Sequence, residues 1–253
     1  MAIKHRIIFM TLLCVVIAVA IIANEQSSEF SRNIYESEDG GSIPYQFLEP
    51  DNIQVDQRYP LLVFLHSAGE VGTDNTIQLA NFPTQFLSKQ NKEDYPAYIL
   101  APQCPQSDRW ASNMGMSENP TNAMRLTLEL IEKLIGEHNI DRQRIYVIGV
   151  SMGGSGAYDI VSRRPDLFAA AVPICGTTNG TNASRMKDVA LWIFHGEDDQ
   201  VVSVNASRMI VQALEAEGAS PKYTEYENAG HGIWGLAYNE PDFLPWLFGQ
   251  QKE

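Results

Sequence analysis

Short apolar runs rich in β-branched residues alternate along this chain with longer amphipathic stretches. Most of the short runs are almost continuously apolar, which is typical of parallel strands covered on both faces. This alternation predicts an α/β fold with a mostly parallel sheet and helices on both faces, in which ligands bind at the carboxyl ends of the strands. The predicted strands are residues 61–67, 97–103, 144–150, 168–175, 190–196 and 222–227, and the predicted helices are residues 121–138, 152–164, 205–217 and 242–248.

Two further strands precede this alternating region. Residues 33–37 and 42–48 flank a Gly40-Gly41 turn, which predicts an antiparallel hairpin at the sheet edge and brings the sheet to about eight strands. No linker rich in Pro, Gly or Ser divides residues 24–253, so we expect a single catalytic domain there. Only the segment 176–189 separates the predicted strand at residues 168–175 from the one at residues 190–196, and it is too short for a lid domain.

The N-terminal segment, residues 1–23, has the pattern of a targeting signal. A basic start is followed by residues 7–23, which carry no charge, and then by polar residues from Asn24 onward. This pattern predicts a signal peptide and a secreted or periplasmic protein. The apolar run 7–23 also just reaches the length of a membrane span, so an uncleaved anchor holding an extracytoplasmic domain is the alternative. The membrane is expected as a partner only in that second case.

Charge and cysteine content narrow the possible partners. The chain has 18 Lys and Arg against 31 Asp and Glu, a net charge of −13, which argues against nucleic acid binding. Three cysteines, Cys14, Cys104 and Cys175, are too few for a disulfide scaffold. The absence of a CxxC motif or of Cys and His at ligand spacing predicts no metal site. For Cys104 and Cys175 we favour free buried thiols over a disulfide.

The strand at residues 144–150 leads into the motif Gly149-Val-Ser-Met-Gly153. A sharp turn between a strand and a helix presents its central side chain, and small residues on either side prevent clashes there. Ser151 is therefore the candidate nucleophile. The alternative is a glycine-rich helix start in which Ser151 acts only as an N-cap.

A serine nucleophile needs a base and an acid that orients the base. His231 lies in a loop of small residues after the last predicted strand, downstream of Ser151, and is the candidate base. His195 fits less well, because the acidic cluster follows it in the chain. That cluster is Glu197-Asp198-Asp199, from which we select Asp199, with Asp198 second and a merely solvated acidic loop as the alternative.

The tetrahedral intermediate needs two donors for its oxyanion. One is predicted to be the backbone N–H of Met152, directly after the nucleophile, and the other the backbone N–H of Ala68, in the loop after the strand at residues 61–67. Trp110, Trp234 and Gln103 fall in or near strand-end loops and are candidate substrate-binding residues. For the tryptophans, ordinary core packing is at least as common.

With these residues in place, the chain resembles the α/β-hydrolase superfamily, in the branch of predicted peptidases, phospholipase/carboxylesterases and feruloyl-esterase-like proteins. The resemblance extends from about Tyr35 to Phe248. It rests on the motifs Pro60-Leu-Leu-Val-Phe-Leu-His66, Gly69-Glu70, Gly72-Thr-Asp-Asn75, Ala101-Pro-Gln-Cys-Pro105 with Arg109-Trp110, Asp141, Arg144-Ile-Tyr146, Gly149-Val-Ser-Met-Gly-Gly154, His195-Gly-Glu-Asp-Asp199 and Gly230-His231.

The resemblance implies a Ser151–Asp199–His231 triad that works without a metal or cofactor. It implies a serine carboxylic-ester hydrolase, and export together with an open cleft suggests hydroxycinnamoyl or acetyl esters of an extracellular polysaccharide. A peptidase on the same triad and a non-catalytic binding module that keeps the fold are the alternatives. The chain departs from the usual pattern at Ser67, where such proteins usually have glycine beside the oxyanion hole. The acyl and alcohol specificity and the oligomeric state stay open.

Overall fold

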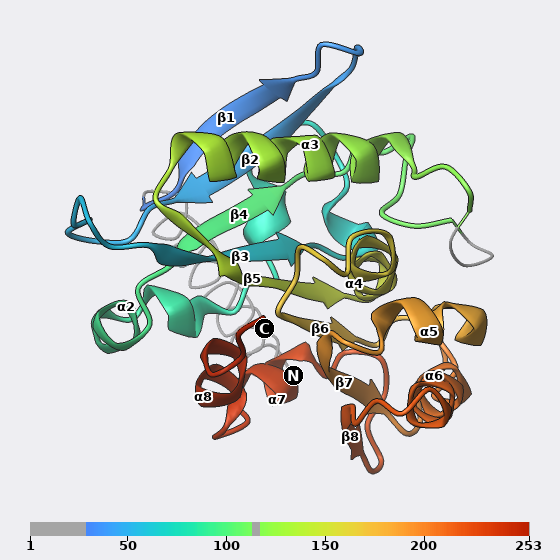
Figure 1. Ribbon diagram of the computed structural model, residues 1–253. Coiled ribbons are helices and arrows are strands. Elements are labelled where there is room, and N and C mark those ends of the chain that lie inside the picture. Colours follow the sequence, from blue (N-terminus) through green and yellow to red (C-terminus); the bar gives the residue numbers. More distant parts are fainter. Residues whose placement is uncertain (1–28, 113–116, 253) are drawn as a thin grey trace, which may run out of the picture.

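The computed structural model describes residues 29–112 and 117–252, which form one eight-stranded sheet with helices packed against it (Figure 1). The strand order is β1-β2-β4-β3-β5-β6-β7-β8. β2 is antiparallel to β1 and to β4, and every other pair of neighbours is parallel. The strands are β1 (Ser31–Glu36), β2 (Ser42–Leu48), β3 (Tyr59–Leu65), β4 (Tyr98–Pro102), β5 (Ile140–Val150), β6 (Ala170–Ile174), β7 (Ala190–Gly196) and β8 (Lys222–Tyr226).

The predicted sheet is confirmed, including the hairpin at its edge. The largest difference is at β5, which begins at Ile140 rather than at residue 144. Ile140 is fully buried and pairs with Tyr59, whereas the residues that follow it, up to 144, are all polar. The ladder between β3 and β5 shifts register after Tyr59. These polar residues hid the start of the strand, because an apolar run is what identifies a buried strand in a sequence.

Helices cover both faces of the sheet, as predicted. Along β3, Leu61, Val63 and Leu65 join one apolar cluster with residues of α3, α4 and α6, because successive side chains of a strand point to opposite faces. Leu62 and Phe64 join the other cluster with residues of α7 (Trp234–Tyr238) and α8 (Phe243–Phe248). The longer helices are α3 (Asn122–Glu137), α4 (Met152–Arg163) and α6 (Asn205–Ala216).

The shorter helices include several that the sequence pattern did not indicate. Of them, only α8 (Phe243–Phe248) was expected. A helix of one turn is too short to show a 3.6-residue period, so it escapes a pattern-based prediction. Between β6 and β7 the chain forms only η4 and α5, which agrees with the expected lack of a lid domain at that place. The unpredicted elements are α2 (Lys89–Asp94), α5 (Ala183–Met186), α7 (Trp234–Tyr238) and the 3₁₀ helices η1 (Ala68–Glu70), η2 (Ile77–Leu79), η3 (Thr84–Leu87) and η4 (Gly180–Asn182).

The predicted targeting segment, residues 1–23, lies outside the described residues, as does Cys14. Within the described ranges no helix has the length and apolar character needed to cross a membrane. Cys104 and Cys175 are buried free thiols, as favoured from the sequence. The single-domain organisation of residues 24–253 stays a prediction.

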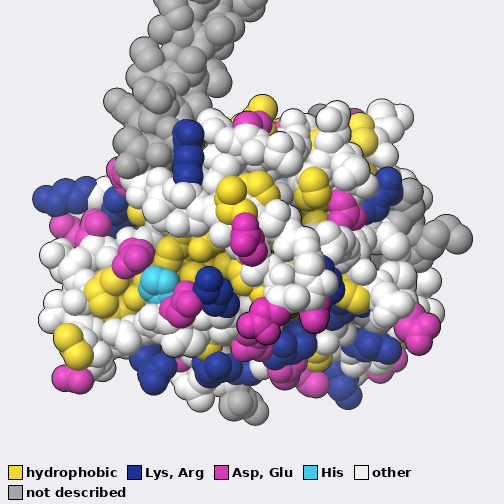
Figure 2. Space-filling model, turned by 90° about the horizontal axis from the view of Figure 1, so that it is seen from above, with side chains coloured by type: hydrophobic (Ala, Val, Ile, Leu, Met, Phe, Trp, Pro, Cys, Tyr) yellow, Lys and Arg dark blue, Asp and Glu magenta, His cyan; other side chains and the backbone are white. Residues whose placement is uncertain are grey.

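The surface carries charges of both signs. Figure 2 shows Asp and Glu side chains interspersed with Lys and Arg on one face of the molecule. Several arginines form ion pairs with carboxylates, such as Arg125 with Glu129 and Arg164 with Asp166. These ion pairs neutralise the positive charge of the arginines locally, in a chain whose Asp and Glu residues already outnumber its Lys and Arg residues.

Candidate active site

Ser151 is the single residue between the end of β5 and the start of α4, and its backbone has φ 55° and ψ −111°. This left-handed backbone is costly for a residue with a side chain and turns the hydroxyl out of the sheet. The two glycines of the motif are needed for space. A Cβ on Gly149 would lie 1.9 Å from the carbonyl oxygen of Gly153, and a Cβ on Gly153 would lie 1.9 Å from the carbonyl oxygen of Leu65.

The three side chains of the predicted triad meet at the carboxyl ends of the strands. His231, in the loop after β8, has its Nε2 2.8 Å from the Ser151 Oγ. Its Nδ1 is 2.6 Å from Oδ2 of Asp199, in the loop after β7. With the proton on Nδ1, His231 donates to Asp199 and accepts from the serine hydroxyl, which is the arrangement that serine activation requires.

The structure distinguishes Asp199 from its acidic neighbours. Asp198 is exposed, whereas the Asp199 side chain is fully buried and its Oδ1 accepts the backbone N–H groups of Val201 and Val202 at 2.8 and 2.9 Å. Burial by itself would raise the pKa of Asp199, but the hydrogen bonds from His231 and from those two N–H groups lower it below its ordinary value. Asp199 is therefore held as a carboxylate.

The two predicted oxyanion donors, Met152 and Ala68, line the same cavity as Ser151. Met152 is the first residue of α4, and Ala68 is the first residue of η1. The first N–H groups of a helix have no partner within it and carry its positive dipole end. Both N–H groups thus come from helix starts beside the nucleophile.

The loop that carries Ala68 is held by a carboxylate that the sequence analysis did not select. Glu70 is buried, and its Oε2 accepts both the backbone N–H and the hydroxyl of Ser67, at 2.8 and 2.7 Å. Its Oε1 accepts from the side-chain amide of Asn81 at 2.7 Å. The Ser67 hydroxyl is therefore turned to Glu70, and the pair forms a capping box at the start of η1. The capping-box spacing of Ser67 and Glu70 was the available sequence signal.

His66 supports the same loop from inside. Its Nε2 accepts the backbone N–H of Cys104 at 2.9 Å, so its Nδ1 carries the proton and donates to the Ser67 carbonyl at 2.7 Å. Its own carbonyl accepts from the Trp110 indole N–H at 2.9 Å. Burial lowers the pKa of His66 to about 4, so the ring is neutral near pH 7. His66 is a structural residue of the loop.

Two of the three predicted substrate-binding residues are wrong. Trp110 and Gln103 are fully buried, and each is already hydrogen-bonded within the protein; Gln103, for example, accepts the backbone N–H of Asn75 at 2.7 Å. Loop positions near strand ends suggested contact with substrate, but both side chains fill the core behind the loops. Trp234 is half-buried, with its ring edge-on to His231 at 6.3 Å between centroids. It stands beside the base, although it is not among the residues that line the cavity.

A cavity of about 850 Å³ is lined by Ser151, Met152 and Ala68. The apolar lining is aliphatic, and hydroxyl and amide side chains make up much of the remainder. Among the described residues that line the cavity, none is aromatic. The other lining residues are Val71, Gln106, Asp108, Arg109, Ala111, Ser112, Ser155, Thr177, Thr178, Asn179, Gly180, Val202 and Met209.

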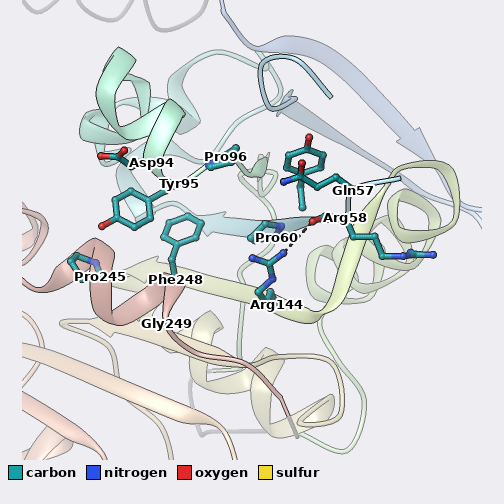
Figure 3. A pocket seen from close by; sticks show the side chains of 11 residues that line it. Gln57, Arg58, Pro60, Asp94, Tyr95, Pro96, Arg144, Pro245, Phe248 and Gly249 are labelled. Atoms are coloured by element: carbon teal, nitrogen blue, oxygen red, sulfur yellow. Dashed lines mark hydrogen bonds between the residues drawn. The ribbon is translucent and has the colours of Figure 1, made fainter. Parts of the chain in front are cut away.

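A second cavity, of about 400 Å³, lies at the opposite ends of the strands (Figure 3). It is lined by the first residues of β3 and by Tyr95, Phe248 and Arg144. In Figure 3 Arg144 reaches towards the carbonyl oxygen of Arg58, to which it donates at 3.1 Å. Among the described residues that line this cavity there is no Ser, Cys or His, whereas the first cavity contains Ser151.

One group of side chains has the composition of a metal site. Single ligand atoms of Cys175, His195 and Asp199 lie within 4.8 Å of one another, and all three residues are buried. Burial raises the pKa of the Cys175 thiol to about 12, so it keeps its proton, and it donates to the His231 carbonyl at 3.2 Å. His195 and Asp199 are likewise committed to hydrogen bonds within the protein. These residues do not fit a metal centre.

The sheet order, the strained serine after β5 and the histidine after β8 define the protein as an α/β-hydrolase. The sequence model of the dienelactone hydrolase family matches residues 85–236, which is more than half of the chain. The protein belongs to the dienelactone hydrolase family.

Individual relatives are esterases. The chain is 27% identical over 172 residues to a bifunctional acetylxylan esterase/xylanase of Neocallimastix patriciarum, covering 68% of this chain and 23% of that protein. It is 24% identical over 174 residues to acetylxylan esterase A of Emericella nidulans, covering 60% of this chain and 57% of that one. A solved thermostable esterase superposes with a TM-score of 0.84 at 37% identity, covering 89% of this chain and 64% of the other. The chain thus spans less than two thirds of the length of each of these proteins.

Proposed function

We propose that this protein is a serine carboxylic-ester hydrolase that works through an acyl-enzyme intermediate. The observation that carries the proposal is the hydrogen-bonded chain from Ser151 through His231 to Asp199, with contacts of 2.8 and 2.6 Å. A weak nucleophile, a base within reach and a group that orients the base are what acyl transfer needs. The esterase relatives support the same reaction class.

In the first half-reaction, the Ser151 Oγ attacks the ester carbonyl while His231 Nε2 takes its proton. The new oxyanion accepts hydrogen bonds from the backbone N–H groups of Met152 and Ala68. Both donors are already in place, so no free energy is needed to reorganise them during the reaction. His231 then gives the proton to the leaving alcohol, and the acyl group stays on Ser151. The buried, ionised Asp199 stabilises the imidazolium that forms in between.

In the second half-reaction, a water molecule takes the place of the alcohol. His231 removes a proton from that water as it attacks the acyl-enzyme, and the oxyanion forms again at the same two donors. Collapse of the intermediate releases the acid and returns the proton to Ser151. The cavity beside Ser151 is lined by polar side chains that include the partly exposed Ser112 and the exposed Asn179, which supports direct access for this water.

We infer that the acyl group is short, and that an acetyl ester is preferred over a hydroxycinnamoyl ester. A hydroxycinnamoyl group presents an aromatic ring, which proteins usually meet with aromatic side chains. The described lining of the cavity has none, and the sequence-based candidate Trp110 is buried elsewhere. Hydroxyl and amide groups such as those of Thr178 and Asn179 suit the hydroxyl groups of a sugar. The two acetylxylan esterase relatives agree with this preference.

The proposed substrate, an acetylated polysaccharide, lies outside the cell. This is consistent with the predicted signal peptide at residues 1–23 and with a secreted or periplasmic enzyme; an uncleaved anchor would hold the same domain at the outer face of the membrane. Determining the N-terminal residue of the protein recovered from the exported fraction separates the two. A chain that begins near residue 24 supports cleavage, and an intact Met1 supports the anchor.

A fluorophosphonate probe tests the serine mechanism directly. The purified protein and Ser151→Ala are incubated with the probe, and the labelled peptide is identified by mass spectrometry. We expect one label, on Ser151, that disappears in the variant. Absence of labelling in well-folded wild-type protein would overturn the proposal in favour of a non-catalytic module.

An ester panel tests the acyl preference. Turnover is compared for 4-nitrophenyl acetate, butyrate and octanoate, for methyl ferulate, for acetylated xylan and for a matched pair of acetyl amide and ester. We expect acetyl esters to give the highest kcat/KM, and acetylated xylan to release acetate. Higher kcat/KM on methyl ferulate than on acetates would refute the acyl inference, and amide cleavage as fast as ester cleavage would favour the peptidase alternative.

A further inference from the structure

A second imidazole, that of His195, lies close to the acid of the triad. His195 is fully buried near the end of β7. Its Nε2 is 2.9 Å from the carbonyl oxygen of Val202, and a carbonyl oxygen only accepts, so Nε2 carries a proton. The same nitrogen is 3.2 Å from Oδ2 of Asp199. The Nδ1 then accepts from the hydroxyl of Ser207, on α6, at 2.7 Å.

Three hydrogen-bond donors hold the carboxylate of Asp199. Its Oδ1 accepts the backbone N–H groups of Val201 and Val202. Its Oδ2 accepts from Nδ1 of His231 at 2.6 Å, and the Nε2 of His195, whose N–H donates to the Val202 carbonyl, lies 3.2 Å from the same oxygen. The side chains of Asp199 and His195 are both completely buried, so no water competes for these contacts. The ring of His195 therefore lies next to the oxygen that orients the base.

We propose that His195 is a positioning residue of the triad, whose Nε2–H holds the Val202 carbonyl beside Asp199 and lies close enough to Asp199 Oδ2 to offset part of the negative charge of that oxygen. The inference rests on the proposed esterase mechanism. Ser207 completes the arrangement, because its hydroxyl fixes the ring and its tautomer from the other side. The Asp199 carboxylate is held at both oxygens, at Oδ1 by the N–H groups of Val201 and Val202 and at Oδ2 by His231, and His195 borders it at Oδ2.

This role has a consequence for the pH dependence of the reaction. Without the N–H dipole of His195 beside it, the full charge of the Asp199 oxygen would act on His231, which would then hold its second proton more tightly. The acid limb of the rate profile would move to higher pH. Asp199, Ser151, the Cys175 thiol and the Trp234 ring face His231.

The titratable neighbours of His195 do not themselves account for the expected shift of the acid limb. Asp199 and the Cys175 thiol lie against it, and Glu225 is its partner residue on β8. Glu225 is paired with Arg208 and hydrogen-bonded to Tyr223, which lowers its pKa, so it stays ionised through the pH range of the measurement.

The test measures how fast a fluorophosphonate modifies Ser151 at a series of pH values. In this reaction the Ser151 Oγ forms a bond to phosphorus, fluoride leaves, and the serine proton passes to His231, so no ester substrate need be known. Wild type is compared with His195→Leu, which removes the N–H, and with His195→Gln, which keeps an amide N–H at similar reach. For the Leu variant we expect a roughly tenfold lower plateau rate and an acid limb about one pH unit higher, since one unit corresponds to a tenfold change in proton binding. The Gln variant should recover most of both.

The results separate a failure of the role of His195 from a failure of the proposed function. A folded Leu variant with the wild-type plateau and acid limb would overturn the inference, as would a Gln variant no better than Leu, which would indicate packing alone. If wild type itself is not modified, the proposed function fails; if it is modified and the Leu variant behaves identically, only the role of His195 fails.

A second pair of variants covers the case in which the Leu variant does not fold. Ser207→Ala removes the hydroxyl that fixes the His195 ring without touching Asp199 or His231. We expect a slower plateau and an acid limb shifted in the same direction, by less than in the Leu variant. The matched control is Ser162→Ala, another buried serine, whose hydroxyl donates to the Tyr158 carbonyl at 2.7 Å. A Ser207→Ala profile that coincides with the Ser162→Ala profile would refute the inference.

Discussion

Gly153 is the position where helix α4 touches the strand that leads into the oxyanion loop. A Cβ added there would lie 1.9 Å from the Leu65 carbonyl oxygen and 2.7 Å from the His66 carbonyl oxygen. Ordinary contact begins at 3.4 Å, so the two backbones must move apart until the 1.9 Å separation has grown to that distance. Both obstacles are main chain, which cannot rotate away as a side chain could. We therefore expect Gly153→Ala to displace the loop that presents Ala68.

The cost can be estimated in two parts. Overpacking of this kind typically costs about 1–3 kcal/mol, and the upper end applies because backbone must move. The gain in helix propensity from glycine to alanine returns about 1 kcal/mol, which leaves a loss of about 2 kcal/mol. For a chain of this size that corresponds to a Tm lower by roughly 4–8 °C. Loss of one oxyanion donor lowers kcat by about 10²–10³-fold, because the donor acts in the transition state.

The assay combines thermal unfolding with steady-state hydrolysis of 4-nitrophenyl acetate. KM should change much less than kcat. Gly136→Ala is the matched control: this glycine lies in α3, is exposed and has nothing within 4 Å of an added Cβ, so the same substitution should stabilise the protein by about 0.5–1 kcal/mol. A Gly153→Ala protein whose Tm and kcat match those of Gly136→Ala would refute the reasoning.

Four further outcomes are expected. Ser151→Gly should be more stable than Ser151→Ala by about 1 kcal/mol in urea unfolding, because both lack the hydroxyl but only glycine adopts φ 55° without strain; equal stabilities would exclude a strained serine. The free energy of unfolding should fall by about 3 kcal/mol between pH 7 and pH 4 through His66, because its folded pKa is lowered to about 4 and the unfolded chain binds the proton first; a variant His66→Gln should show a shallower slope. Ser67→Ala should lower stability by about 1 kcal/mol yet change kcat by less than about threefold, since the hydroxyl serves the cap rather than the oxyanion; a larger fall in kcat would indicate a direct role. Asp199→Asn should lower kcat by on the order of 10⁴-fold, and Asp198→Asn by no more than about twofold; the reverse order would reassign the acid.

The parts of the fold that sequence reasoning predicted well are those with a strong local period. Strands β2 and β7 have the predicted bounds, and α3 differs by one residue at each end. Each of them has a continuous or periodic apolar pattern that tertiary contacts reinforce. The start of β5 and the one-turn helices were missed, because polar residues interrupt the first and the others are shorter than the period that would reveal them.

The residues of the site likewise divide into those that the sequence pattern identifies and those that only tertiary contacts distinguish. Ser151 and His231 were identifiable because chain order and glycine spacing constrain them, and Asp199 was one of three neighbouring acids until its burial and its contact with His231 distinguished it. Trp110 was misassigned because a loop position in the sequence carries no information on which way a side chain points.

The sequence by itself determined the class of fold, the order of strands and helices along the chain, and the position of the sharp turn after β5. These features depend on interactions between residues close in the chain: apolar periodicity, helix starts and glycines at a turn. Only the tertiary structure decided which carboxylate meets His231, that Glu70 is buried against Ser67, and that His195 lies 3.2 Å from Asp199. The contact of Asp199 with His231 joins two separate strand-end loops, and the burial of Glu70 and His195 depends on the elements packed around them, which no local pattern records.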